Sequence, residues 1–308
     1  MLIDCNKRGR STLRLFVILA CLVSFAAASA CGIRRTVKVE VPEKVLQAKT
    51  ARLDELIDLV NLYRDRVSSL SSSSMKATYA SGKLESGVLQ EYRSAPGYIL
   101  LKQPDKIRIS IQNPITKTSI ADMLSVGNDF QVWVPSRNKL YFGNNNIKEF
   151  VAEGQSENSS ITIRPAHIYD AIVPARIATA ISGRWIAMEE DQDAAARYYV
   201  LIEYSEMDNR RLYPLRKIWI DRSNLAVARQ QFYENEGRLT GIVRYSHLMS
   251  TEGIMLPLAI KVERPVDGYT LDLTFRAWTL NPHLEDSAFA LTTPAGAERV
   301  ELREKGRS

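Results

Sequence analysis

Residues 97–109, Gly-Tyr-Ile-Leu-Leu-Lys-Gln-Pro-Asp-Lys-Ile-Arg-Ile, decide the fold of this chain. An apolar run leads into Gln103-Pro104-Asp105, which is a turn signal. After the turn, apolar Ile107 and Ile109 alternate with charged residues. Alternation of period two is typical of a half-buried strand, so this stretch predicts a β-hairpin with one apolar face.

The same alternation continues on both sides of the hairpin. It is found at Phe130, Val132 and Val134, and it resumes from Tyr199 to the end of the apolar pattern at Phe275. Turn signals separate the runs at short intervals, among them Ser81-Gly82, Ala95-Pro96-Gly97, Asn113-Pro114, Gly127-Asn128, Pro135-Ser136 and Gly143-Asn144. Short strands joined by tight turns predict one strongly curved antiparallel sheet.

Helical spacing is found in two places. Apolar residues recur at steps of three and four at Leu46, Leu53, Leu56, Ile57, Val60, Tyr63, Val67 and Leu70, and the serine cluster 68–74 is expected to end this helix. A second apolar stripe predicts two short central helices, Pro165 to Val173 and Ala175 to Ser182, with Pro174 between them. The expected fold class is α+β: an incomplete antiparallel β-barrel covered by an N-terminal helix and short central helices.

The amino terminus has the order of an export signal. Four basic residues (Lys7, Arg8, Arg10 and Arg14) precede an uncharged apolar segment from Leu15 to Ala30. This segment is shorter than the roughly 20 apolar residues that span a bilayer. We therefore predict a signal peptide over residues 1–30, with a retained membrane anchor as the alternative.

The end of this segment, Ala28-Ser29-Ala30-Cys31-Gly32, resembles the lipobox of bacterial lipoproteins. That resemblance implies acylation of Cys31, the only cysteine that would remain after cleavage. Ordinary cleavage after Ala28 or Ala30 is the alternative. Residues 31–42 are then a lipidated tether, for which an edge strand is the other interpretation, and residues 43–308 form a single β-domain with a helical lid around 165–182.

Composition argues against several functional classes. Removal of residues 1–30 takes away four basic residues and one acidic residue, so the formal net charge falls from +6 to +3. No basic run suggests nucleic-acid binding. The three histidines, His167, His247 and His283, stand in unrelated contexts without a second ligand at metal spacing. No nucleophile-elbow, phosphate-loop or dinucleotide motif is present, so we predict no enzyme, no metal and no cofactor.

Five segments, in order, resemble the LolA/LolB superfamily of lipoprotein carriers and their lipid-binding relatives. Residues 97–109 resemble the family's hairpin ending in Lys-Arg-Pro, and Ser125 to Pro135 resemble a later hairpin. The remaining three are Lys139 to Phe142, Leu215 to Asp221 and Phe289 to Ala297. One departure matters, because Gln103 stands where the soluble carriers have an arginine that helps to hold a helical lid closed.

The resemblance implies an apolar cavity between sheet and helices that accepts acyl chains. By alternation, the candidate lining residues are Ile99, Leu101, Ile107, Ile109, Ile111, Val132, Ile218, Ile220, Leu271, Leu273 and Phe275. The candidate lid residues are Ile168, Ile172, Ile177 and Ile181. The apolar face of a strand is more often solid core than ligand lining, and that interpretation stays open for each of them.

These features predict a membrane-anchored lipoprotein that binds or accepts lipidated or hydrophobic ligands in the cell envelope. Its expected partners are the membrane, through acyl chains on Cys31, lipid or lipoprotein acyl chains, and a periplasmic carrier protein, with no nucleic acid. Gly32, in place of an inner-membrane-retaining Asp, favours an outer-membrane lipoprotein facing the periplasm. The alternative is an assembly lipoprotein with a filled interior that scaffolds partner proteins.

Overall fold

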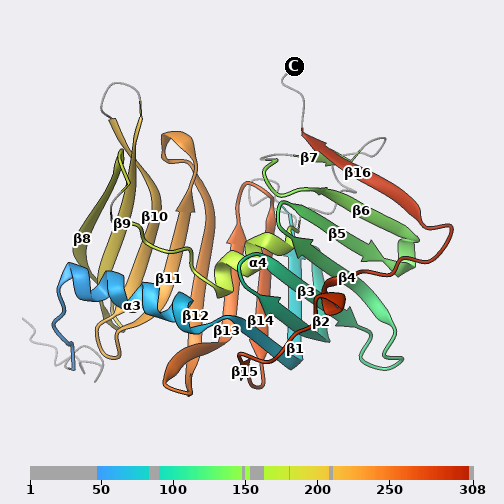
Figure 1. Ribbon diagram of the computed structural model, residues 1–308, viewed down its shortest axis with the longest axis horizontal. Helices are drawn as coiled ribbons and strands as arrows, with labels where there is room; N and C mark the ends of the chain where they lie inside the picture. The colour runs from blue at the N-terminus through green and yellow to red at the C-terminus, as the bar shows by residue number, and fades with distance from the viewer. Residues whose placement is uncertain are drawn as a thin grey trace, which may run out of the picture. The chain divides into compact units, whose positions relative to one another are not determined.

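The computed structural model describes residues 47–82, 90–147, 150–152, 163–179, 181–207 and 211–304. The predicted signal peptide, the lipobox with Cys31 and the tether lie outside these residues. Within them, the structure contains two α-helices and one extended sheet (Figure 1).

The first half of the described chain contains α3 (Leu53–Arg66), β1 (Ser69–Ser81), β2 (Gln90–Lys102), β3 (Lys106–Gln112), β4 (Ser119–Val126), β5 (Asp129–Val134), β6 (Lys139–Asn144), β7 (Phe150–Ala152) and α4 (Pro165–Ile172). The second half contains β8 (Arg184–Gln192), β9 (Arg197–Met207), β10 (Arg211–Asp221), β11 (Ala226–Tyr233), β12 (Leu239–Thr251), β13 (Ile254–Arg264), β14 (Tyr269–Phe275), β15 (Thr279–Leu280) and β16 (Glu298–Glu304). Three 3-10 turns complete it: η2 (Pro135–Arg137), η5 (Asn235–Gly237) and η6 (Asp286–Phe289).

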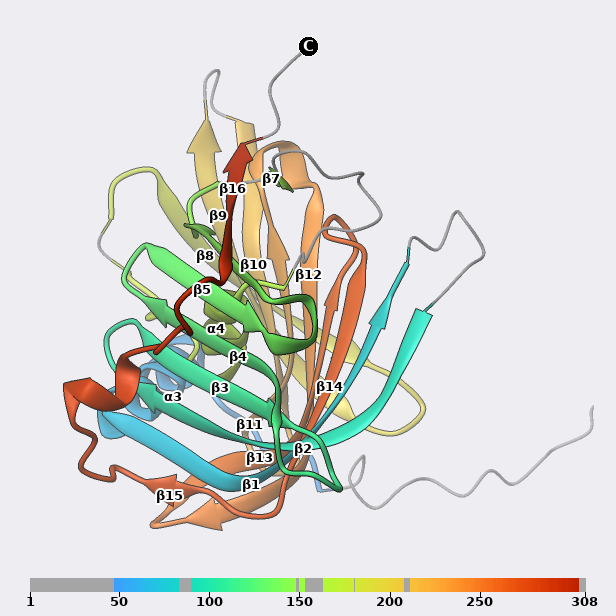
Figure 2. The same ribbon diagram turned by 90° about the vertical axis from the view of Figure 1, so that its right-hand side faces the viewer.

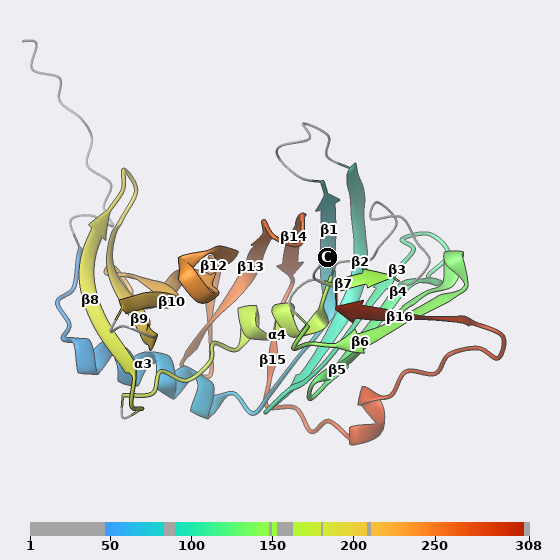
Figure 3. The same cartoon turned by 90° about the horizontal axis from the view of Figure 1, so that it is seen from above.

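The sheet consists of two meanders joined side by side. Its strand order is β7-β16-β6-β5-β4-β3-β2-β1-β14-β13-β12-β11-β10-β9-β8. All of its pairings are antiparallel except that of β16 with β6. The two meanders meet at β1 and β14, where Met75 pairs with Phe275 and Ser81 with Tyr269. Strands far apart in sequence thus make one curved surface that does not close between β7 and β8 within the described residues (Figures 2 and 3).

Both helices cover one face of this sheet, α3 in front of β8–β12 and α4 nearer the centre (Figure 1). Leu56, Ile57 and Val60 of α3 pack against apolar residues of β9 and β10. Ile168 and Ile172 of α4 lie in a larger core cluster formed by both meanders. Among the described residues, neither helix has the length and apolar character needed to cross a membrane. The predicted fold class, a curved and incomplete antiparallel barrel with helices on it, is confirmed.

The extent of the first helix was predicted wrongly. Helix α3 begins at Leu53 and ends at Arg66, whereas Ser69, Leu70 and Ser71 to Ser74 belong to β1. Leu46 of the predicted stripe lies outside the described residues. The serine hydroxyls are satisfied there by the returning chain, because Ser69 Oγ donates to Pro282 O (2.7 Å) and Ser72 Oγ to Ala277 O (2.7 Å). These partners lie more than 200 residues away, so the local composition of the cluster could not reveal the strand.

The second central helix, Ala175 to Ser182, was also predicted wrongly. The described residues of this stretch are irregular, although α4 itself is confirmed at Pro165–Ile172. Side chains of α3 bind the backbone here: Asn61 Nδ2 donates to Ile177 O (3.0 Å), and Ile177 N donates to Asn61 Oδ1 (2.9 Å). These bonds take the place of helical ones, while the predicted lid residue Ile181 is exposed.

The signal at Ala95-Pro96-Gly97 predicted a turn, but these residues lie inside β2. The register between β1 and β2 shifts on either side of them, between Ser72 and Met75 and between Ala77 and Tyr79. A Cβ atom on Gly97 would stand 2.2 Å from the backbone oxygen of Ser110 on β3. The glycine is therefore required by close strand approach and not by a reversal of the chain.

Replacing Gly97 with Ala should lower the free energy of unfolding by about 1–3 kcal/mol, because the added methyl forces β2 away from β3. Urea unfolding followed by circular dichroism measures this. Ser94→Ala, at an exposed position of the same strand, should change stability little. A Gly97→Ala protein as stable as the wild type would contradict the close approach of the two strands.

Candidate apolar ligand site

The residues predicted to line a cavity are placed in the packed interior. Eight of them belong to the larger core cluster, and Ile111 packs against it: Ile99, Leu101, Ile107, Ile109, Val132, Leu271, Leu273 and Phe275. Ile218 and Ile220 instead lie under α3, in the same cluster as the lid residue Ile177. The lid residues Ile168 and Ile172 are buried in the larger cluster. Ligand contact by these residues stays a prediction.

A cavity of about 280 Å³ is found beside them, between α3 and the turns at one end of β10–β13. Of the lining and lid residues predicted from the sequence, only Ile172 lies in its wall. Its walls are mostly apolar: Leu59, Val60, Leu62, Tyr63, Arg66, Ile172, Pro174, Asn224, Leu225, Ala226, Val227, Tyr245, Gly253, Ile254, Met255 and Pro257. We call this cavity the α3 pocket. Its volume is just below the roughly 300–1,000 Å³ typical of small-ligand sites.

One flank of α3 supplies the helical wall. Leu59, Leu62, Tyr63 and Arg66 recur at steps of three, one and three residues, which places them along one stripe of the helix. The deeper stripe of Leu56, Ile57 and Val60 is used for packing on the sheet. Leu62 remains 53% exposed and stands at the mouth of the pocket. The predicted apolar stripe omitted Leu59 and Leu62, although both are apolar residues on the flank next to it.

The opposite wall comes from the β12–β13 hairpin. Thr251 pairs with Ile254, and the two residues between them, Glu252 and Gly253, both have positive φ (51° and 77°). A two-residue turn of this kind reverses the chain tightly. It brings Ile254 and Met255 to the pocket, where Met255 stays 37% exposed.

Two tyrosines, Tyr63 and Tyr245, line the α3 pocket. Tyr63 Oη donates to Ile172 O (3.0 Å), and Tyr245 Oη donates to Ala171 O (2.5 Å) while accepting from Gln230 Nε2 (2.5 Å). Burial raises the pKa of both phenols, so both stay neutral. Because the hydroxyls are committed to backbone carbonyls, the tyrosines present mainly their rings to the pocket.

Hydrogen bonds hold helix α3 at its carboxyl end as well as along its side. Gln103 Nε2 donates to Arg64 O (2.6 Å) and to Val67 O, and Asn281 Nδ2 donates to Arg66 O (2.9 Å). These bonds satisfy carbonyls that a helix terminus leaves free. Gln103, noted in the sequence as a departure from the carriers' arginine, therefore fixes the end of the helix that lines the pocket.

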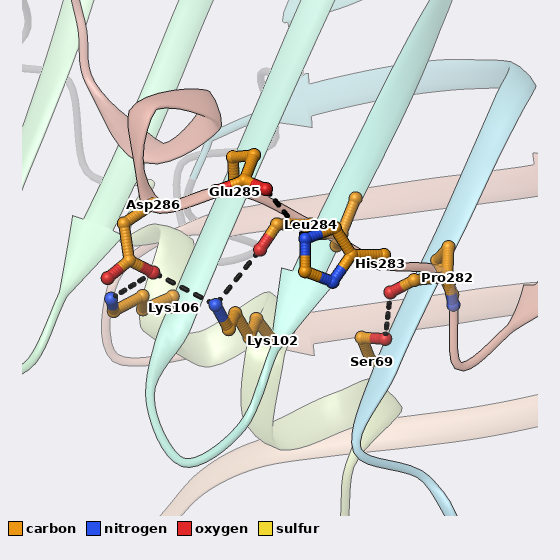
Figure 4. Close-up of polar contacts among 8 residues, drawn as sticks. All are labelled: Ser69, Lys102, Lys106, Pro282, His283, Leu284, Glu285 and Asp286. Carbon is orange, nitrogen blue, oxygen red and sulfur yellow. Dashed lines mark hydrogen bonds and ion pairs between the residues drawn. The ribbon is translucent and has the colours of Figure 1, made fainter.

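A polar cluster on the β2–β3 hairpin holds the returning chain (Figure 4). Lys102 Nζ and Lys106 Nζ each lie 2.9 Å from Asp286 Oδ1, and Lys102 Nζ also donates to Leu284 O (2.9 Å). Hydrogen bonds from Lys106 and Lys102 lower the pKa of Asp286 to about 2. Both lysines are occupied by these partners, so the cluster secures the segment after β15 and forms no open site.

The histidines are placed apart from one another. His167 Nδ1 lies 3.2 Å from Tyr269 Oη, and burial lowers the pKa of His167 well below its ordinary value. His283 Nε2 lies 2.6 Å from Glu285 Oε1 in an exposed loop, and His247 is an exposed residue of β12 with positive φ. Within the part of the chain that the structure describes, no three His, Cys, Asp or Glu side chains gather as metal ligands would.

Asp170 on α4 combines an exposed position with a raised pKa. Its side chain is exposed to water, yet desolvation by surrounding protein raises its pKa to about 6, against the opposing effect of Arg216, Arg264 and Arg64.

The folded protein should therefore bind a proton at Asp170 more tightly than the unfolded chain, whose Asp has a pKa of about 3.9. The resulting stability is fully present below about pH 4 and is lost as pH rises through about 6. Asp170→Asn should remove this dependence, so that its unfolding free energy gains on the wild type between pH 4 and 7 in urea titrations. Asp58→Asn, at an exposed position of α3, is the control. Parallel pH profiles for wild type and Asp170→Asn would contradict the shift.

Comparison with known proteins gives matches among solved structures only. No protein-family model matches the sequence, and no curated protein matches it significantly. A LolA superfamily protein from Nitrosomonas europaea is 18% identical, with 79% of this chain and 99% of that chain covered and a TM-score of 0.48. A DUF1329 family protein from Desulfovibrio piger is 16% identical over 78% and 98% of the two chains, with a TM-score of 0.49.

A third structure, a domain described as an outer membrane lipoprotein-sorting protein from Vibrio parahaemolyticus, is 12% identical. The match covers 76% of this chain and 95% of that domain, with a TM-score of 0.48. At these identities the similarity concerns the fold alone.

Proposed function

We propose that this protein binds the apolar part of a lipid or of a lipidated protein, non-covalently, in the α3 pocket. The observation that carries the proposal is the pocket itself: about 280 Å³, walled by apolar side chains, with Leu62 and Met255 exposed at its mouth. Each methylene moved out of water contributes about 0.8 kcal/mol. A pocket of this size suits a single acyl chain or part of one.

Filling the pocket should test this function. Val227 is half-buried on the pocket wall, and Val227→Phe would occupy the space of the ligand. We expect this variant to bind the uncharged apolar dye N-phenyl-1-naphthylamine at least roughly tenfold more weakly than wild type, through lost contact area. Dye fluorescence measures binding, and lipid extracted from the purified wild-type protein is identified by mass spectrometry.

The same substitution at an exposed site provides the matched control. Val126 lies on β4 away from the pocket and is exposed, so Val126→Phe should bind the dye as wild type does. Equal binding by wild type and Val227→Phe, together with a lipid-free wild-type protein, would exclude the pocket as a ligand site.

We propose further that acyl chains on Cys31 hold the protein on a membrane, with the outer membrane as the expected location because Gly32 follows Cys31. Two or more chains anchor a protein stably, whereas one does so only marginally. A membrane-anchored protein would accept its ligand at the membrane surface. A periplasmic carrier that delivers the ligand is then the expected partner.

Cys31→Ser should release the protein from the membrane fraction, while its thermal unfolding midpoint stays unchanged because the fold depends on the sheet and helices. Cell fractionation with density separation of the two membranes measures both anchoring and location. Cys21→Ser, within the predicted signal peptide, is the matched control and should remain membrane-bound. A Cys31→Ser protein that stays on the membrane would contradict acylation.

One observation favours the alternative of an assembly scaffold. Strand β8 lies at an edge of the sheet, and all of its side chains except Ile186 are exposed, including Trp185 and Met188. An exposed edge strand can pair with an extended segment of a partner. The lipid analysis above separates the two functions, because a scaffold with a filled interior would carry no lipid and bind no dye.

A further inference from the structure

Arg66, the last residue of α3, is the charged side chain in the wall of the otherwise apolar α3 pocket. It is exposed, and it lies one turn of helix beyond Leu62, which stands at the mouth of the pocket. A cation in this place is in contact with both water and the end of the apolar cavity.

The guanidinium of Arg66 is held in position by the β12–β13 turn. Its Nη2 donates a hydrogen bond to the backbone carbonyl oxygen of Glu252 (3.1 Å), and not to the Glu252 carboxylate. The two terminal nitrogens of Arg66 lie 3.9 and 4.0 Å from the point where a Cβ atom on Gly253 would stand. A side chain at position 253 would thus touch the guanidinium, and glycine lacks one. An arginine has five N–H donors, of which one is used here.

The charged residues next to Arg66 on α3 differ from it in their partners. Arg64 Nη1 donates to Pro174 O (3.2 Å), and Asp65 forms an ion pair with Arg176. Arg66, in contrast, pairs with no carboxylate in the described part of the chain. An arginine fork with unused donors matches the two oxygens of a carboxylate or of a phosphate.

We infer that the α3 pocket selects a single-chain amphiphile with an anionic head, a carboxylate or a phosphate, whose head binds Arg66 and whose chain fills the pocket. This inference rests on the proposed function, because it assumes that the pocket takes an apolar chain. The α3 pocket, of about 280 Å³, suits one chain, and one guanidinium in its wall suits one head group.

Competition against N-phenyl-1-naphthylamine tests the head-group preference. Laurate, lauryl phosphate and methyl laurate share one chain, and only the ester lacks charge; they are compared at pH 8 below their aggregation limits. Wild type should bind laurate and lauryl phosphate about five- to tenfold more tightly than methyl laurate, since a partly exposed charged contact adds modestly to affinity. The preference should shrink in 0.5 M NaCl, because salt screens exposed charges. The ratio of laurate to lauryl phosphate separates a fatty acid from a phosphate-headed lipid as the better-matched class.

Arg66→Gln should reduce the affinity for laurate to that for methyl laurate, and it should leave binding of the ester and the dye unchanged. Arg66→Lys should keep part of the preference, because charge remains without the planar fork. Arg52→Gln, an exposed arginine just before α3 and outside the pocket, is the matched control and should keep the full preference.

Equal affinity of wild type for laurate and methyl laurate would overturn the inference while leaving the pocket as an apolar site. The same holds if Arg66→Gln weakens acid and ester equally, because that result would indicate a packing role. Failure of the dye and of all three laurate compounds to bind would instead overturn the proposed function.

Discussion

The pairing of β1 with β14 is the interaction on which the rest of this structure depends. It joins residues 75–81 to residues 269–275 in an antiparallel register and thereby makes two local meanders into one sheet. Each meander can form from neighbouring hairpins, but only this non-local contact gives both of them a common apolar face. The larger core cluster contains residues of both meanders, so this core forms only when β1 pairs with β14.

The pairing of β1 with β14 also sets the position of α3. The helix ends at Arg66, and β1 begins three residues later, where Ser68 N and Ser69 N both donate to Asn281 Oδ1. The start of the strand and the end of the helix are thus held by the same returning segment, together with Gln103 from the β2–β3 hairpin. The pocket lies where this fixed helix passes the turns of β10–β13, so it is a consequence of how the meanders are joined.

Sequence patterns predicted the parts of the fold that local periodicity controls. The hairpin at 97–109, the amphipathic character of α3 and the helix at α4 follow from spacing within a few residues. The serine strand, the glycine at 97 and the irregular stretch after Pro174 could not be predicted, because their partners come from segments distant in the chain. The pocket residues were not predicted for a related reason. Alternation identifies the inward face of strands such as β3, and helices already cover that face. The pocket is made by turn residues, for which no period exists, and by a second flank of α3, where Leu59 and Leu62 have helical spacing but were not included in the predicted stripe.

The bonds around α3 also limit how a ligand could enter. Moving the helix away from the sheet would break the hydrogen bonds of Asn61, Tyr63 and Arg64 to residues 172–177, and those of Gln103 to its carboxyl end. At about 1 kcal/mol net for each bond, their loss alone is comparable to the lower end of the roughly 5–15 kcal/mol that stabilises an ordinary domain. The buried contacts of Leu56, Ile57 and Val60 would be lost as well. Entry by way of the mouth, past Leu62 and Met255, breaks none of these contacts, and it brings the trailing end of a chain to the guanidinium of Arg66.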